Sequence, residues 1–252
     1  MSGGYYIFIA DLHLSCDQKA KWQYLISWLD SLRYPVEGLY ILGDLFKYWL
    51  GDDYRDEMIE QLDAAFKRLS QRMEIILLKG NRDFLLGDGF ARGSVRILTD
   101  GCVVDLYGKS TVLLHGDRLC RRDWRYRCFR WAADNIVSRS VFTSLPMDWR
   151  DWLARSVQNS LPHKSAADVW LDYNWLEQLL SNEQAVQVIY GHLHRIVLRV
   201  HDHYREVGLP SWDDKPSWLR YYHDHVVCFL TASNDRNPDE ATYVFSQTKY
   251  NN

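Results

Sequence analysis

Short apolar runs alternate with longer amphipathic stretches in the first third of the chain. The runs 5–10, 39–42 and 75–78 are almost continuously hydrophobic, which is typical of strands buried on both faces of a parallel sheet. Between them, apolar residues recur at helical spacing within 19–32 and within 58–69. The pattern predicts alternating strands and helices, and therefore an α/β fold.

The later part of the chain predicts more strands around a helical segment. Residues 102–106 and 111–114 have the pattern of a hairpin that turns at Gly108. Further strands are expected at 186–190, 196–200, 226–230 and 242–245. Residues 119–182 have helical periodicity, with Pro146 and Pro162 as expected interruptions. We expect one domain over 1–252, with two packed sheets, helices outside them, and 119–182 as a helical insertion that acts as a lid.

Composition narrows the class of protein. With 252 residues, 47% of them hydrophobic and 25% charged, the chain has enough apolar material for a full core, which excludes a disordered protein. A formal net charge of -3 argues against nucleic acid as the main partner. No apolar run approaches the roughly 20 residues that span a bilayer, and the five scattered cysteines indicate a reducing compartment, so we expect a cytoplasmic protein. The pattern carries no signal of oligomeric state.

A polar cluster follows directly after each of five predicted strands. The clusters are Asp11-x-His13, Gly43-Asp44, Gly80-Asn81, His115 and Gly191-His192-x-His194. Because ligands of open α/β sheets gather beyond the carboxyl ends of the strands, we expect these clusters to form one site. Two carboxylates, one amide and four imidazoles suit manganese, magnesium, iron or zinc, whereas the absence of thiolates argues against a structural zinc.

This donor set predicts a centre with two divalent metal ions. Two ions provide a hydroxide at neutral pH and neutralise charge on phosphoryl oxygens, which is what hydrolysis of a phosphate ester or anhydride requires. Asp44, alone at its strand end, is the candidate for the bridging carboxylate. The glycines before Asp44, Asn81 and His192 would let the backbone turn sharply beside the ions. Each cluster alone occurs as often in an ordinary turn or as a surface pair as in a metal site. The prediction therefore depends on the ordered set of all five clusters.

The five clusters, in this order, resemble the blocks D-x-H, G-D, G-N-[HR]-[DE], H and G-H-x-H of the calcineurin-like metallophosphoesterases. The resemblance runs from residue 6 to about residue 195 and implies a four-layer α/β/β/α sandwich. It also implies two ligand sets. One metal would be held by Asp11, His13, Asp44 and His194, and the other by Asp44, Asn81, His115 and His192.

Longer segments, 10–14, 39–46, 49–53, 80–87 and 115–117, are similar to the UDP-2,3-diacylglucosamine diphosphatases. This resemblance implies manganese-dependent hydrolysis of a lipid-linked UDP-sugar at its α-phosphorus. The products would be UMP and 2,3-diacylglucosamine 1-phosphate, in a step of lipid A biosynthesis. It further implies peripheral contact with the cytoplasmic face of the inner membrane.

The resemblance also suggests residues that contact substrate. Arg82 stands where many relatives have histidine; a guanidinium suits bidentate stabilisation of phosphoryl oxygens, and its alternative role is a salt bridge to Asp83 or another carboxylate. Asn81 would assist Arg82 in catalysis. The remaining candidates for substrate contact are His192, Asp123, Lys164 and either Ser156 or Ser160.

The helical insertion is rich in arginine and aromatic residues. The arginines between 118 and 130 would suit a diphosphate or an anionic membrane surface. The candidates for an acyl-chain groove are Trp124, Trp131, Phe142, Leu145, Trp149, Trp152 and Leu153. The alternative is an amphipathic helical pair that packs on the core and exposes its arginines.

Three departures from the family pattern keep other functions open. Leu193 stands where relatives favour threonine, the pair Arg121-Arg122 is atypical, and the segment after Arg199 matches poorly. One alternative is therefore a metallophosphoesterase that acts on a soluble nucleotide diphosphate or another phosphate ester. The other is a catalytically silent module for protein binding, which the complete set of ligand residues disfavours.

Overall fold

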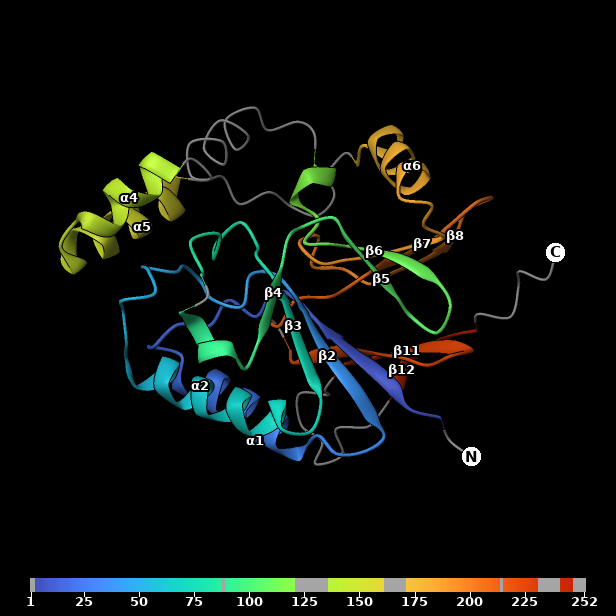
Figure 1. Ribbon diagram of the computed structural model, residues 1–252, viewed down its shortest axis with the longest axis horizontal. Helices are drawn as coiled ribbons and strands as arrows, with labels where there is room; N and C mark the ends of the chain where they lie inside the picture. Colours follow the sequence, from blue (N-terminus) through green and yellow to red (C-terminus); the bar gives the residue numbers. More distant parts are fainter. Residues whose placement is uncertain are drawn as a thin grey trace.

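The computed structural model describes residues 3–87, 89–120, 136–160, 171–213, 215–230 and 241–246. Its strands form two sheets that face each other (Figure 1). The larger sheet contains, in spatial order, β12 (Ala241–Ser246), β11 (His225–Leu230), β10 (Ser217–Tyr221), β1 (Tyr5–Ile9), β2 (Val36–Leu42), β3 (Glu74–Leu78) and β4 (Arg96–Leu98). The smaller contains β5 (Cys102–Asp105), β6 (Ser110–Leu114), β7 (Gln187–Tyr190), β9 (Arg205–Gly208) and β8 (Val197–Val200).

Helices cover the outer face of each sheet. On the larger sheet lie α1 (Lys19–Ser31) and α2 (Glu57–Ser70), and on the smaller lies α6 (Tyr173–Asn182). The short 3-10 helices η1 (Phe90–Gly93) and η2 (Asp117–Leu119) lie in the connections. The predicted four-layer α/β/β/α sandwich is confirmed.

The alternation of side chains along the strands builds three apolar layers. In β1, Ile7 and Ile9 pack under α1 and α2, whereas Phe8 points into the space between the sheets. In β7, Ile189 faces the larger sheet and Val188 packs under α6. Both faces of these strands are therefore buried, which is why their sequences are continuously apolar.

Capping residues explain where two of the helices begin. The side chain of Asp56 accepts a hydrogen bond from the backbone N–H of Ile59 at 2.8 Å, at the start of α2. Asp172 does the same for Trp175 at 3.2 Å, at the start of α6. Both are N-caps, which satisfy backbone donors that the first helical turn leaves free.

The segment 119–182 contains three described helices. These are α4 (Ile136–Ser144), α5 (Met147–Ser160) and α6, and Pro146 separates the first two, as expected. The pair α4–α5 lies to one side of the sandwich (Figure 1), whereas α6 packs on the smaller sheet. In the part of the chain that the structure describes, no helix has both the length and the apolar character needed to cross a membrane.

Three strands are not predicted by the sequence pattern. β4 is only three residues long, and β9 contains the charged residues Arg205 and Glu206. β10 pairs antiparallel with β1 although it contains Ser217 and Arg220. Glu206 is buried because it accepts hydrogen bonds from the Tyr190 hydroxyl at 2.5 Å and from His201 at 2.8 Å. These partners come from tertiary structure, so a local hydrophobic pattern misses the strand.

Candidate active site

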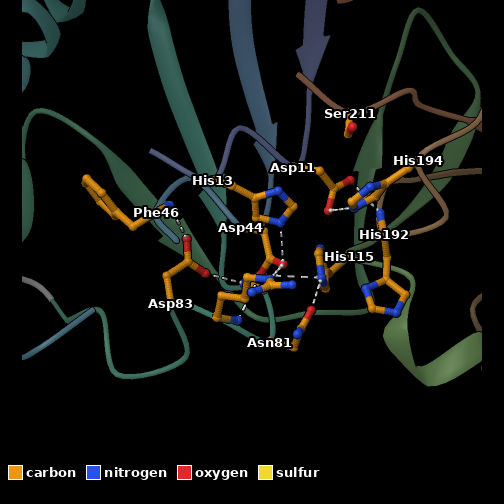
Figure 2. A network of polar contacts seen from close by, with 12 residues as sticks. Asp11, His13, Asp44, Phe46, Asn81, Asp83, His115, His192, His194 and Ser211 are labelled. Carbon is orange, nitrogen blue, oxygen red and sulfur yellow. Dashed lines mark hydrogen bonds and ion pairs between the residues drawn. The ribbon is translucent and has the colours of Figure 1, made fainter. Parts of the chain in front are cut away.

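The predicted ligands meet at one edge of the sandwich, beyond the ends of five strands. The larger sheet contributes the residues that follow β1, β2 and β3, and the smaller contributes those that follow β6 and β7. Figure 2 shows their side chains pointing toward one another. The residues are Asp11, His13, Asp44, Asn81, His115, His192 and His194. The two sheets thus supply different halves of one site.

Two overlapping groups of side chains have the spacing of metal sites. The ligand atoms of Asp11, His13 and His194 lie within 4.8 Å of one another, and so do those of Asp11, His115 and His192. The carboxylate of Asp44 lies between the groups. Its Oδ2 is 3.2 Å from Nε2 of His13, and its Oδ1 is 3.6 Å from Nε2 of His115. Both Asp11 and Asp44 therefore face both groups.

The burial and hydrogen bonding of the Asp11 and Asp44 carboxylates indicate whether these residues suit a metal ion. Asp11 is 0% exposed and Asp44 is 1% exposed. Oδ2 of Asp11 accepts the backbone N–H of His192 at 2.6 Å, but Oδ1 is buried and accepts no hydrogen bond. The nearest basic group to this oxygen is Nε2 of His194, at 3.6 Å. A buried carboxylate is costly unless it is paired, so this position favours a bound cation. Oxygen and imidazole donors without thiolates fit a pair of divalent ions.

The pKa values of the histidines reflect the burial and the charges of the site. Burial by itself would lower the pKa of His13, but hydrogen bonds from its ring to Asp213 and Asp44 raise that pKa to about 9. For His115, burial also acts downward, and the charges of Asp44 and Asp11 raise the pKa to about 9. Burial and the neighbouring His115 lower the pKa of His192 to about 4. The negative potential that favours a proton on His13 and His115 equally favours a metal cation.

The backbone at the site adopts a conformation that side chains rarely take. Five of the candidate ligands have positive φ angles, a region that favours glycine. They are Asp11 (53°), His13 (48°), Asp44 (52°), His192 (63°) and His194 (52°). Such residues cost on the order of 1 kcal/mol or more each and cluster where function requires a fixed geometry.

Glycines make room for this packing, and of the three glycines expected to allow a sharp turn only Gly43 has a positive φ. At Gly43, whose φ is 87°, an added Cβ would collide with the ring of His115, and at Gly80 it would collide with the carboxylate of Asp44. Any larger residue would therefore push two ligands apart.

Asp83 connects two of the ligand loops. Its Oδ1 accepts the backbone N–H of Gly80 at 2.7 Å, and its Oδ2 accepts that of Leu45 at 2.8 Å. Burial and the charge of Asp44 raise the pKa of this fully buried carboxyl to about 6. Asp83 thus ties the loop that presents Asn81 to the loop that presents Asp44. The sequence pattern did not assign it this role.

Arg82 is a partly exposed residue that contacts Asp44. Its backbone N–H donates to Oδ1 of Asp44 at 2.8 Å, and its guanidinium Nε lies 3.5 Å from Oδ2 of the same residue. The side chain is 30% exposed, so its remaining donors are accessible to a bound molecule. The carboxylate in its ion pair is Asp44, not Asp83.

Another acidic residue at the site, Asp213, was not predicted. Its carboxylate lies 3.0 Å from Nδ1 of His13 and 3.6 Å from Nδ1 of His194. Burial would raise the pKa of Asp213, but the hydrogen bond and charge of His13 lower it to about 2. It lies in the loop between β9 and β10, and nothing in the local sequence of this loop indicates that it reaches the site.

The substrate contacts predicted from the insertion are only partly within the described residues. Asp123, Lys164 and the arginines and tryptophans of 121–135 lie outside them, as does the side chain of Ser160. Ser156 is half-buried on α5. The indoles of Trp149 and Trp152 are each 63% exposed. These two tryptophans therefore face outward.

A pocket of about 240 Å³ lies between α5 and the core. It begins beside the ligands, because Leu14 and Phe46 line it and stand one and two residues after His13 and Asp44. The other lining residues include apolar side chains and charged ones: Trp49, Leu50, Met58, Ile59, Met147, Lys47, Asp56, Asp148, Asp151 and Arg155. The pocket extends the site toward the insertion.

This sandwich, with its ligands at strand ends, defines a class of protein. The family model described as Calcineurin-like phosphoesterase matches residues 5–196. A solved structure of Vacuolar Protein Sorting 29 from Cryptosporidium parvum shares the fold, with a TM-score of 0.50 and 13% identity, over 98% of this chain and 100% of that one. The expected metallophosphoesterase fold is confirmed.

Curated relatives narrow the family. The chain is 35% identical over 226 residues to a UDP-2,3-diacylglucosamine hydrolase of Shewanella piezotolerans, covering 87% of this chain and 95% of the relative. It is 36% identical over 195 residues to the protein of the same name from Serratia proteamaculans, covering 75% and 81%. The chain belongs to the UDP-2,3-diacylglucosamine hydrolase family of calcineurin-like phosphoesterases.

Proposed function

We propose that this protein is a dinuclear-metal hydrolase that cleaves UDP-2,3-diacylglucosamine at the α-phosphorus. The products are UMP and 2,3-diacylglucosamine 1-phosphate, and the reaction is a step of lipid A biosynthesis. The observation that carries the proposal is the convergence of all seven candidate ligands at one edge of the sandwich. Relatives that carry the substrate in their names, aligned over most of the chain, support the choice of substrate.

The candidate ligands divide between two ions, for which we propose manganese. Asp11, His13, Asp44 and His194 would hold one ion, and Asp44, Asn81, His115 and His192 the other. Asp44 is the proposed bridge because its two oxygens face histidines of different groups. When bound, two such ions provide a hydroxide nucleophile and neutralise phosphoryl charge.

Asn81 and Arg82 act on the substrate itself in this proposal. The guanidinium of Arg82 donates hydrogen bonds to the phosphoryl oxygens, where negative charge grows in the transition state. The amide oxygen of Asn81 lies 2.8 Å from Nε2 of His115, so its amide nitrogen remains to orient the phosphoryl group. We also propose substrate contacts for His192, Asp123, Lys164 and a serine of α5, Ser156 or Ser160.

The pocket beside the ligands supports an acylated substrate. Its walls include Trp49, Leu50 and Ile59, which suit an alkyl chain, beside charged residues such as Asp151 and Arg155. Since α5 forms one wall, we propose that 119–182 acts as a lid within a single domain of 1–252. The residues that would line an acyl-chain groove are then those of the pocket. Trp149 and Trp152, which face outward, have another role.

For Trp149 and Trp152 we propose contact with the cytoplasmic face of the inner membrane. Both indoles lie on α5 and are largely exposed, and indole rings favour the membrane interface. We expect the double variant Trp149→Ser, Trp152→Ser to bind anionic phospholipid vesicles roughly tenfold more weakly in co-sedimentation. Tyr34→Ser, which removes a side chain that is 90% exposed at the far end of the sandwich, is the matched control.

The test of the function is release of UMP with manganese present. Wild-type protein, Asp44→Ala and His115→Ala would each receive UDP-2,3-diacylglucosamine and, separately, UDP-N-acetylglucosamine. We expect turnover of the acylated compound by wild type only. Equal turnover of both compounds would favour a soluble nucleotide diphosphate as substrate. Full activity in both variants would refute the dinuclear site.

A further inference from the structure

The loop between β9 and β10 places one carboxylate behind two candidate ligands. Both oxygens of Asp213 lie 3.0 Å from Nδ1 of His13. Oδ2 also lies 3.6 Å from Nδ1 of His194. In both histidines the opposite nitrogen, Nε2, faces the buried carboxylates, toward Asp44 at 3.2 Å and toward Asp11 at 3.6 Å. The two imidazoles thus have the same orientation, with Nδ1 toward Asp213 and Nε2 toward the site.

The residue before Asp213 anchors the loop. The backbone N–H of Trp212 donates to the carbonyl of Asp11 at 3.1 Å, and its indole Nε1 donates to the carbonyl of Ser217 at 2.5 Å. The indole is 2% exposed and packs edge-on against Trp28, with ring centroids 5.8 Å apart. The position of Asp213 is therefore set by the core and by β1, the strand that presents Asp11 and His13.

The other group of ligands is supported differently. Nδ1 of His115 donates to the backbone carbonyl of Leu42 at 2.9 Å. That partner is neutral, whereas the partner of His13 and His194 carries a negative charge. Lys21, whose Nζ lies 3.4 Å from Oδ1 of Asp213, offsets part of that charge. His13 and His115 therefore differ in the group that accepts the hydrogen bond from Nδ1, although the charge of Asp117 acts to raise the pKa of both His115 and His192.

We propose that Asp213 is a positioning residue that orients His13 and His194 toward one metal ion and strengthens binding of that ion alone. The inference rests on the proposed dinuclear function. A carboxylate that accepts the second N–H of a ligating histidine fixes its tautomer and ring orientation and increases its basicity, and losing it typically lowers metal affinity about 10–100-fold. Asp213 accepts a hydrogen bond from His13 and lies within ion-pair distance of His194. Both histidines belong to the same group, so the effect should be specific to one site.

The test is calorimetric titration of manganese into metal-free Asp213→Ala and Asp213→Asn proteins. Wild type should bind two equivalents. In Asp213→Ala one of the two affinities should fall about 10–100-fold while the other stays within twofold, and Asp213→Asn, which keeps an acceptor without the charge, should fall less. The matched control is Asp224→Ala, because Asp224 forms an exposed carboxylate–imidazole pair with His225 at 2.6 Å, outside the site.

The outcomes separate this inference from the proposed function. Two unchanged affinities in Asp213→Ala would overturn the role of Asp213 and leave the dinuclear site standing. An equal loss at both sites would also overturn it, since a general structural defect predicts that result. Wild type that binds no manganese would refute the proposed function itself. If Asp213→Ala does not fold, the near-isosteric Asp213→Asn replaces it in the manganese titration, after a check that its melting temperature is unchanged.

Discussion

Individual residues at the site are held by backbone as much as by side-chain contacts. Asp83 illustrates this. Its carboxylate accepts hydrogen bonds from the backbone N–H groups of two loops that present candidate ligands. Those loops turn through residues with positive φ, such as Asp44. The hydrogen bonds that the backbone N–H groups of Gly80 and Leu45 donate to Asp83 compensate part of the conformational cost of that turn.

Replacing Asp83 tests this role. Asp83→Ala leaves the buried N–H groups of Gly80 and Leu45 without acceptors, so we expect the free energy of unfolding to fall by about 3 kcal/mol and manganese affinity to fall with it. Urea unfolding and metal titration measure the two effects. Asp63→Ala, which removes a comparable bond to the N–H of Ala91 at 3.0 Å, should lower stability but not metal affinity. Unchanged metal affinity in Asp83→Ala would contradict the prediction.

Arg82 gives a second prediction at this scale. Because its guanidinium would bind phosphoryl oxygens most tightly in the transition state, Arg82→Gln should lower kcat about 10²–10³-fold with little change in stability. Steady-state kinetics and a melting curve measure both. Arg96→Gln, which breaks an exposed pair with Glu74, is the control. A kcat within twofold of wild type would contradict the catalytic role and leave Arg82 only its ion pair with Asp44.

At the scale of elements, one arginine attaches the α4–α5 pair to the core. Arg150 is 5% exposed. Within the insertion it donates to the carbonyls of Thr143 and Leu145, near the turn between the two helices. Across to the core it donates to the carbonyl of Leu50 at 3.1 Å and to Asp53 at 2.6 Å. This contact sets the distance between α5 and the opposite wall of the pocket.

Loss of this attachment should affect acylated substrate selectively. In Arg150→Met, we expect KM for UDP-2,3-diacylglucosamine to rise about tenfold, with a smaller change in kcat, because the pocket loses its wall while the ligands keep their positions. Manganese affinity should stay within twofold. Arg68→Met, which breaks an exposed pair with Asp30, controls for loss of an arginine. An equal fall in metal affinity and turnover would contradict the prediction.

At the scale of the whole molecule, the candidate ligands connect the two sheets. Asp11 and Asp44 come from the larger sheet, and His115 and His192 from the smaller. Metal ions held by both would link the layers of the sandwich. They would also neutralise carboxylates that are buried in its interior.

Metal should therefore stabilise the fold. At a free concentration of 100 times Kd, one ion that binds only the native state adds about 2.7 kcal/mol, which for a chain of this size raises Tm by about 5–10 °C. Scanning calorimetry with manganese and with a chelator measures the difference. Asp44→Asn should lose most of the shift. An identical Tm in both conditions would contradict the proposed linkage.

The sequence by itself determined the central strands and the candidate ligands, because both depend on local patterns. A strand buried on both faces must be continuously apolar, so polar residues that follow it directly, such as Asp11 and Asp44, mark its end and the edge of the sheet. The ordered blocks then identified the class of enzyme. The helices α1 and α2 followed equally from local periodicity.

Only the tertiary structure decided which residues support that site. β9 is a strand because Glu206 finds partners on neighbouring segments, Arg150 is buried because four acceptors surround it, and Asp213 meets His13 although 200 residues separate them. Charged residues at such positions look like solvated surface until their partners are in place. Their roles depend on pairings between distant segments, and a pattern read along the chain carries no information about those pairings.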